Sequence, residues 1–135
     1  MRFIYEMNFC SVLMSLGFLL LITMTQAQAT VTYELECFVD RKLDRQTEYS
    51  RDRIDEMRWS VIIRHHDERY ATISRCDSKA PCDEYRVDHM EFTKNVNVSK
   101  YYYFQGQFDV QVFGDGRFIE NNGRGTMAFG QCRRK

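Results

Sequence analysis

The sequence predicts a mainly β domain: a small antiparallel β-sandwich or barrel with at most one charged helix and two disulfide bonds. Short stretches of alternating apolar and polar residues recur along the chain, separated by turns that contain glycine or asparagine. Four cysteines remain once an apolar leader is set aside. Aromatic residues make up 14% of the chain and proline occurs once, a composition that argues against disorder.

Residues 1–29 are typical of a secretory signal peptide. An apolar run from Phe9 to Met24 precedes Ala27-Gln28-Ala29, which has small residues where a signal peptidase reads the chain. The run is shorter than the roughly 20 residues that a spanning helix needs. We therefore expect cleavage before Thr30, or after Ala27 as the alternative. The product is one secreted, extracellular domain over 30–135, with no membrane attachment after cleavage.

The charge balance limits the classes of partner. The chain has 19 basic and 19 acidic residues and so no formal net charge. Binding to nucleic acid or to an anionic membrane surface relies on an excess of basic residues. Neither partner is expected for this protein.

The cysteines predict the covalent framework. Cys10 leaves with the leader, and an even number of cysteines in a small secreted domain indicates two disulfides. Of the three possible pairings we favour Cys76–Cys82, which closes a polar loop, with Cys37–Cys132, which ties the first strand to the last. The spacing of Cys76 and Cys82 is too wide for a zinc knuckle, so no metal site is expected.

The clearest strand covers residues 30–39. Val31, Tyr33, Leu35, Cys37 and Val39 alternate with mostly polar residues, as in a strand with one buried face. The next stretch, 40–58, is densely charged, with opposite charges three residues apart, as on adjacent turns of a helix. We expect a solvated helix there, or an exposed strand at 47–53 as the second interpretation.

A hairpin follows. Residues 59–66 predict a strand with Trp59, Val61 and Ile63 facing inward, and 66–69 turn the chain into a second strand over 70–76. Residues 84–92 predict a weaker strand. Its apolar positions change parity between Val87 and Met90, which a β-bulge would reconcile.

The remaining chain predicts one long strand over 101–113 and two short ones. In the long strand, Tyr102, Phe104, Phe108, Val110 and Val112 would share the apolar face. Turns at 114–116 and 121–123 bound a short strand at 117–120. A last strand at 125–132 offers Met127 and Phe129 as core candidates.

Residues 97–99 form the sequon Asn97-Val98-Ser99 in a polar stretch between two strands. In a secreted chain this motif predicts an N-linked glycan on Asn97 and a loop that faces water. Such a glycan would be a modification and would not by itself indicate a function.

No residue pattern indicates catalysis or a cofactor. His65 and His66 are consecutive and would point to opposite faces of a strand, and His89 stands apart, so we expect surface histidines. The serines lack a nucleophile-elbow context, and the mature cysteines are assigned to disulfides. A small secreted hydrolase that uses these histidines is retained only as an alternative.

The best binding candidate is the polar face of the predicted 101–113 strand. Tyrosines offer flat, amphipathic contact area, while amides and a carboxylate direct hydrogen bonds. We expect a non-catalytic secreted protein that contacts an extracellular protein or glycan through this face. The alternatives are a β-barrel carrier of a small apolar ligand, and a toxin or antimicrobial effector. The candidate residues are Tyr101, Tyr103, Gln105, Gln107, Asp109 and Gln111.

Overall fold

A computed structural model describes residues 30–135. The predicted signal peptide, 1–29, and Cys10 lie outside these residues. In the described part of the chain, no helix is both long and apolar enough to cross a membrane.

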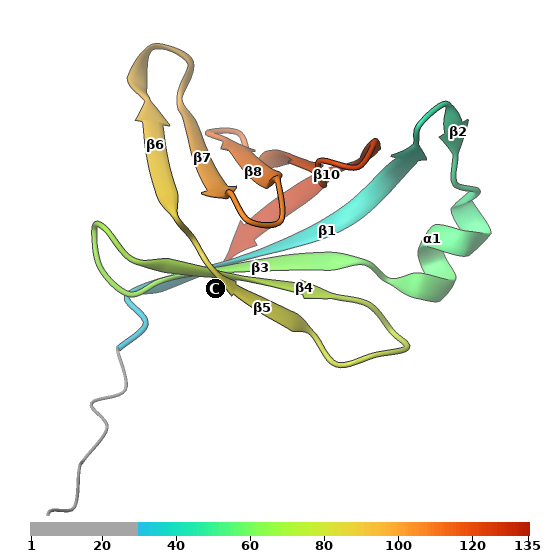
Figure 1. Cartoon of the computed structure of the whole chain (residues 1–135), viewed down its shortest axis with the longest axis horizontal. Helices are drawn as coiled ribbons and strands as arrows, with labels where there is room; N and C mark the ends of the chain where they lie inside the picture. The colour runs from blue at the N-terminus through green and yellow to red at the C-terminus, as the bar shows by residue number, and fades with distance from the viewer. Residues whose placement is uncertain (1–29) are drawn as a thin grey trace, which may run out of the picture.

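The described residues form one curled antiparallel sheet, a half-barrel, with a single α-helix at one end (Figure 1). This confirms the predicted mainly β, antiparallel class. The strand order is β5-β4-β3-β1-β10-β9-β8-β7-β6, and β2 pairs with β1. The elements are β1 (Tyr33–Asp44), β2 (Thr47–Glu48), α1 (Arg51–Met57), β3 (Ser60–His65), β4 (Ala71–Cys76), β5 (Asp83–Arg86), β6 (His89–Thr93), η1 (Lys94–Val96), β7 (Val98–Tyr103), β8 (Phe108–Phe113), β9 (Arg117–Asn121) and β10 (Thr126–Arg134).

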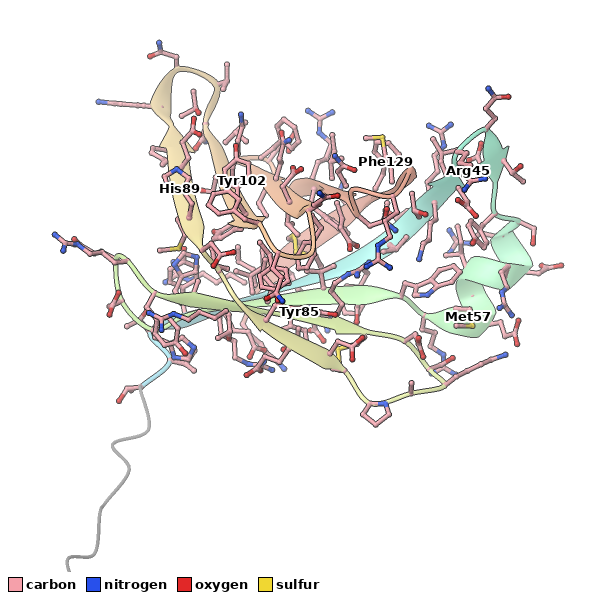
Figure 2. All side chains as sticks on the ribbon, viewed as in Figure 1. Arg45, Met57, Tyr85, His89, Tyr102 and Phe129 are labelled. Carbon is pink, nitrogen blue, oxygen red and sulfur yellow. A yellow bond between two sulfur atoms is a disulfide. The ribbon has the colours of Figure 1, made fainter. Side chains whose placement is uncertain are left out.

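The sheet curls far enough for its inner face to pack against itself. Arg75 of β4 meets Glu120 of β9, and Tyr85 of β5 packs against Phe108 of β8 at 5.1 Å between ring centroids, although neither pair of strands is adjacent. Figure 2 shows Tyr85 on this inner side. The core lies here and comprises Cys37, Val39, Val61, Ile63, Ala71, Ile73, Val87, Tyr101, Phe108, Val110, Val112, Phe118 and Ala128.

β5 and β6 join the two edges of the sheet. β5 pairs with β4 and β6 pairs with β7, so the chain leaves one edge and continues on the other. Between them, the Val87 N–H donates to the Ala71 carbonyl at 3.0 Å and the Asp88 N–H donates to the Tyr102 carbonyl at 2.8 Å. The single bulged strand predicted over 84–92 is therefore wrong: β5 and β6 are separate strands, and the apolar parity changes where the chain passes from one edge to the other.

Both favoured disulfides are present. Cys37 and Cys132 are direct cross-strand partners in the β1–β10 register, with Cα atoms 3.8 Å apart. Cys76–Cys82 closes the β4–β5 connection with Cα atoms 4.2 Å apart. The predicted 59–76 hairpin is also confirmed, as β3 and β4, with Val61 and Ile63 buried.

The helix is shorter than the charge pattern over 40–58 predicts. β1 continues to Asp44 and turns through β2, where Arg41 pairs with Glu48 at 2.6 Å. The extension forms because β10 offers a pairing partner as far as Thr126. Only Arg51–Met57 is helical, capped by the Ser50 side chain, and it buries Ile54 and Met57.

Two predictions about the C-terminal half are wrong. Residues 101–113 form a hairpin, because the chain turns at 104–107, where Gln107 has a φ of 55°. In β10 it is Ala128 and Gly130 that are buried, while Met127 is 37% exposed and Phe129 is half-buried. The parity follows Cys132, whose bond to the buried Cys37 turns the even-numbered positions inward.

Candidate functional site

A large cavity with a volume of about 790 Å³ opens at one end of the half-barrel. It lies where β6 separates from the β3–β4 hairpin, beyond the point at which Val87 and Asp88 hold the edges together. Figure 1 shows β6 and β7 diverging there from β3 and β4, while β7 remains paired with β8. Its lining residues are Thr32, Tyr33, His65, His66, Asp67, Glu68, Met90, Glu91, Phe92, Ser99, Lys100 and Tyr101.

Tyr101 and His65 form the polar part of the cavity wall. The Tyr101 hydroxyl and His65 Nε2 share a hydrogen bond of 2.8 Å between β7 and β3. The Tyr33 ring stacks on the His65 ring, with centroids 4.1 Å apart and an interplanar angle of 15°. The Tyr101 ring meets His65 edge-on, with centroids 5.4 Å apart. Three elements of the sheet thus hold one imidazole between two phenol rings.

Burial keeps both hydrogen-bonding groups uncharged. Tyr101 is only 2% exposed, and burial raises the pKa of its hydroxyl far above the usual range, helped by neighbouring Tyr33. Burial also lowers the pKa of His65 from its ordinary 6.5, with a smaller contribution from His66. Desolvation disfavours the charged form of each group. At neutral pH the wall therefore presents a neutral imidazole and a neutral phenol.

Met90 and Phe92 supply the apolar wall on the β6 side. Phe92 is 61% exposed, although a phenylalanine on a short strand normally packs into a core. Glu91 and Lys100, cross-strand partners on β6 and β7, lie at the rim. Asp67 and Glu68 reach the cavity from the β3–β4 turn, where Asp67 Oδ1 accepts a hydrogen bond from the Arg69 N–H at 2.6 Å.

The residues of the predicted binding face do not share one surface. Tyr101 is buried, and Tyr103 packs against the Tyr85 ring at 5.0 Å. Gln105 and Gln107 belong to the 104–107 turn. Asp109 and Gln111 lie on β8, where the Gln111 amide donates to Asp109 at 3.1 Å.

Tyr102, placed on the apolar face by the sequence pattern, is instead the cross-strand partner of Asp109. Figure 2 shows Tyr102 beside His89, with ring centroids 5.7 Å apart. The turn reverses the parity of the chain between β7 and β8, and this reversal divides the predicted face.

The role of His65 was missed by sequence reasoning, which expects a surface histidine. His65 is half-buried in the cavity wall, and its partner Tyr101 lies 36 residues away along the chain. No local pattern marks such a pair. His66 begins the turn after β3 and also lines the cavity. Within residues 30–135, no three His, Cys, Asp or Glu side chains are grouped so as to hold a metal ion.

Asn97 lies in the β6–β7 connection and is exposed. Its carbonyl accepts a hydrogen bond from the Gly114 N–H at 2.8 Å. Ser99, the third residue of the sequon, is half-buried and lines the large cavity. The sequon asparagine is therefore an exposed residue of the β6–β7 connection, with its side-chain amide beside Gly114.

Comparison of the chain with known proteins finds no matching family model, no matching curated protein and no matching solved structure.

Proposed function

We propose that this protein binds a small ligand with an apolar body and a neutral hydrogen-bonding group, and that the ligand occupies the cavity between the β3–β4 hairpin and β6. The observation that carries the proposal is the uncharged Tyr101–His65 pair in the wall of a 790 Å³ cavity. Ligand pockets are commonly of this size, with mostly apolar walls and a few polar groups that orient the ligand. Binding without turnover is the role proposed.

The charges at the rim favour a neutral ligand over an anionic one. Asp67, Glu68 and Glu91 line the cavity with Lys100 as the only Lys or Arg side chain among the lining residues. A carboxylate ligand would meet repulsion from the acidic side chains, and the neutral Tyr101–His65 pair offers it no opposite charge. An alcohol, ketone or amide head group would bond to the phenol or the imidazole without burying a charge.

The proposal is tested with a neutral phenylnaphthylamine dye, whose fluorescence rises in an apolar site, and with its displacement by decanol or decanoate. We expect decanol to displace the dye and decanoate to do so poorly. Tyr101→Phe should weaken the binding of decanol about tenfold, which is the effect of losing one hydrogen bond to a well-placed polar group. Tyr102→Phe, the adjacent outward tyrosine, is the matched control and should leave displacement unchanged.

Phe92→Ser provides a second variant, because Phe92 is exposed and its loss does not disturb the core. It should weaken dye binding while the thermal unfolding curve stays unchanged. Dye binding that is equal in wild type, Tyr101→Phe and Phe92→Ser would refute the assignment of the site. Turnover of an ester substrate that is lost in His65→Gln would contradict binding without catalysis.

We also propose that the chain is secreted and carries a glycan on Asn97. Two disulfides and an exposed sequon support this location, because disulfides form in oxidising compartments. Expression in a secretory host should yield protein in the culture medium that begins at Thr30. The Asn97→Gln variant should have a lower mass, because it lacks the glycan. Retention of Met1 on the purified protein would refute the signal peptide.

A further inference from the structure

Two further cavities lie at the other end of the half-barrel. Their volumes are about 460 and 170 Å³, and Arg75 and Asp83 line both. The large cavity described above is lined by the start of β1 and the end of β3. The two smaller cavities are lined instead by Lys42 of β1, by Trp59 before β3 and by residues of the β7–β8 turn. We call these two neighbouring cavities, which share Arg75 and Asp83 as wall residues, the charged chamber.

A β-bulge turns Lys42 into the charged chamber. In the β1–β10 register, Val39 pairs with Gly130 and Arg41 pairs with Phe129, which leaves Asp40 as the extra residue. Strict alternation from the buried Val39 would place Arg41 inward and Lys42 outward. The bulge reverses this, so Arg41 lies over the Phe129 ring and Lys42 faces the cavity. Bulges of this kind re-aim side chains toward functional sites.

Lys42 is a half-buried ammonium that lacks a close carboxylate partner. Its Nζ lies 3.7 Å from the centroid of the Trp59 ring, and no salt bridge involves it among the described residues. Burial lowers its pKa, while Glu120, Asp77 and Asp44 act at longer range in the opposite direction. Hydrogen-bond donors on this ammonium therefore remain for an acceptor in the chamber.

Glu120 presents a buried carboxylate, a hydrogen-bond acceptor, to the same chamber. It is 6% exposed, and Oε1 lies 2.5 Å from Arg75 Nε. The contact is an ion pair, and Oε1 accepts no hydrogen bond. A buried carboxylate oxygen without an aligned donor is costly unless a ligand supplies one. The chamber thus holds the Lys42 ammonium, which has no carboxylate partner among the described residues, and the Glu120 carboxylate, whose Oε1 is ion-paired with Arg75 but accepts no hydrogen bond.

The charges in the chamber balance, and its walls are aromatic. Three cationic side chains and three carboxylates line it, so it has no net attraction for a charged ligand. The cations are Lys42, Arg75 and Arg124, and the carboxylates are Asp77, Asp83 and Glu120. The aromatic walls are Trp59, Tyr85, Tyr103 and Phe108.

We infer that the charged chamber is a binding site for a neutral carbohydrate, of the size of one or two pyranose rings. A sugar hydroxyl donates one hydrogen bond and accepts others, so it can satisfy Glu120 and Lys42 together. The C–H groups of a pyranose carry slight positive charge and pack favourably on the faces of aromatic rings. This site is independent of the proposed apolar-ligand cavity.

The only tryptophan of the chain lines the chamber, so its fluorescence reports on this site. We would titrate the mature protein with methyl glycosides of glucose, galactose, mannose and N-acetylglucosamine at millimolar concentrations. At least one should cause a saturable change in Trp59 emission. Lys42→Met keeps the apolar stem and disrupts no salt bridge, and it should weaken binding about tenfold.

Lys94→Met in the β6–β7 connection is the matched control and should bind as wild type does. Tyr101→Phe should also leave the sugar titration unchanged, which separates this site from the apolar-ligand cavity. The inference is overturned if none of the glycosides changes Trp59 emission, or if Lys42→Met binds as tightly as wild type. A response to butyrate without a response to any glycoside would overturn it as well.

Discussion

Removing the disulfide between Cys37 and Cys132 should destabilise the domain more than any other single covalent change. The two cysteines are 95 residues apart, so the bond closes most of the described chain into one loop. In the chain-entropy model a loop of this length contributes about 4.7 kcal/mol to the free energy of unfolding. Cys37 is also fully buried, so replacement by alanine leaves a small void in the core. Domains of this size are stable by only about 5–15 kcal/mol.

The measurement is urea unfolding of the Cys37→Ala/Cys132→Ala double variant, followed by circular dichroism. Cys76→Ala/Cys82→Ala is the matched control, because its cysteines are 6 residues apart and the same model assigns that loop about 2 kcal/mol. The long-range variant should lose about twice as much stability. Equal losses in the two variants would refute the loop-length argument and would indicate that local packing determines the effect of each bond.

Three further predictions concern single positions. Gly130→Ala should cost about 3 kcal/mol in thermal unfolding, because its Cβ would lie 1.8 Å from the Phe38 carbonyl oxygen and 2.8 Å from the Phe118 ring. Arg58→Gly should raise the melting temperature by a few degrees, since Arg58 ends α1 with a φ of 47° and glycine adopts this conformation at roughly 1 kcal/mol less. The folded state lowers the pKa of His65 from 6.5, so the unfolded chain binds more protons and stability should fall as pH drops below 6.5 and through the folded-state pKa. Urea midpoints should show this loss in wild type and a smaller one in His65→Gln.

The covalent framework and the first hairpin could be predicted because each depends on a local or countable pattern. An even number of cysteines with one short polar loop leaves few sensible pairings, and both bonds form as expected. Val61 and Ile63 alternate without interruption, so β3 has the predicted inner face. These features need no knowledge of what lies across the sheet.

The 101–113 hairpin was missed although Gly106 lies in its turn, because a single glycine also fits the interior of a strand. The turn has neither proline nor asparagine, and a glutamine, Gln107, takes the left-handed conformation. Within Tyr101–Gln107 the odd positions are tyrosine or glutamine and the even positions are Tyr102, Phe104 and Gly106, which fits the two faces of one strand. The same pattern therefore fits one long strand or two short ones of reversed parity, and only the pairing of Tyr101 with Val110 distinguishes them.

The residues of β10 that face the core could be predicted, but the prediction was based on the wrong side chains. Met127 and Phe129 are the larger apolar side chains, which favours them as core residues. Cys132 has the opposite parity, and its bond to Cys37 places it on the buried side. The predicted disulfide therefore already indicated that the even-numbered positions of β10 face the core. A covalent bond to a core position constrains the inner face of a strand more strongly than the size of its apolar side chains does.

Both candidate sites lie where the sheet departs from regular pairing. A regular small barrel fills its interior with its own side chains and leaves little room for a ligand. Here, the chain leaves the β4 edge at Val87–Asp88 and continues as β6 on the β7 edge, and the apolar-ligand cavity opens beside β6. The bulge at Asp40 turns Lys42 inward, and the charged chamber includes it. Each departure interrupts apolar alternation, so a search for regular strands treats it as a defect. In a small β domain whose regular positions are occupied by core packing, such interruptions are the places to look for binding residues.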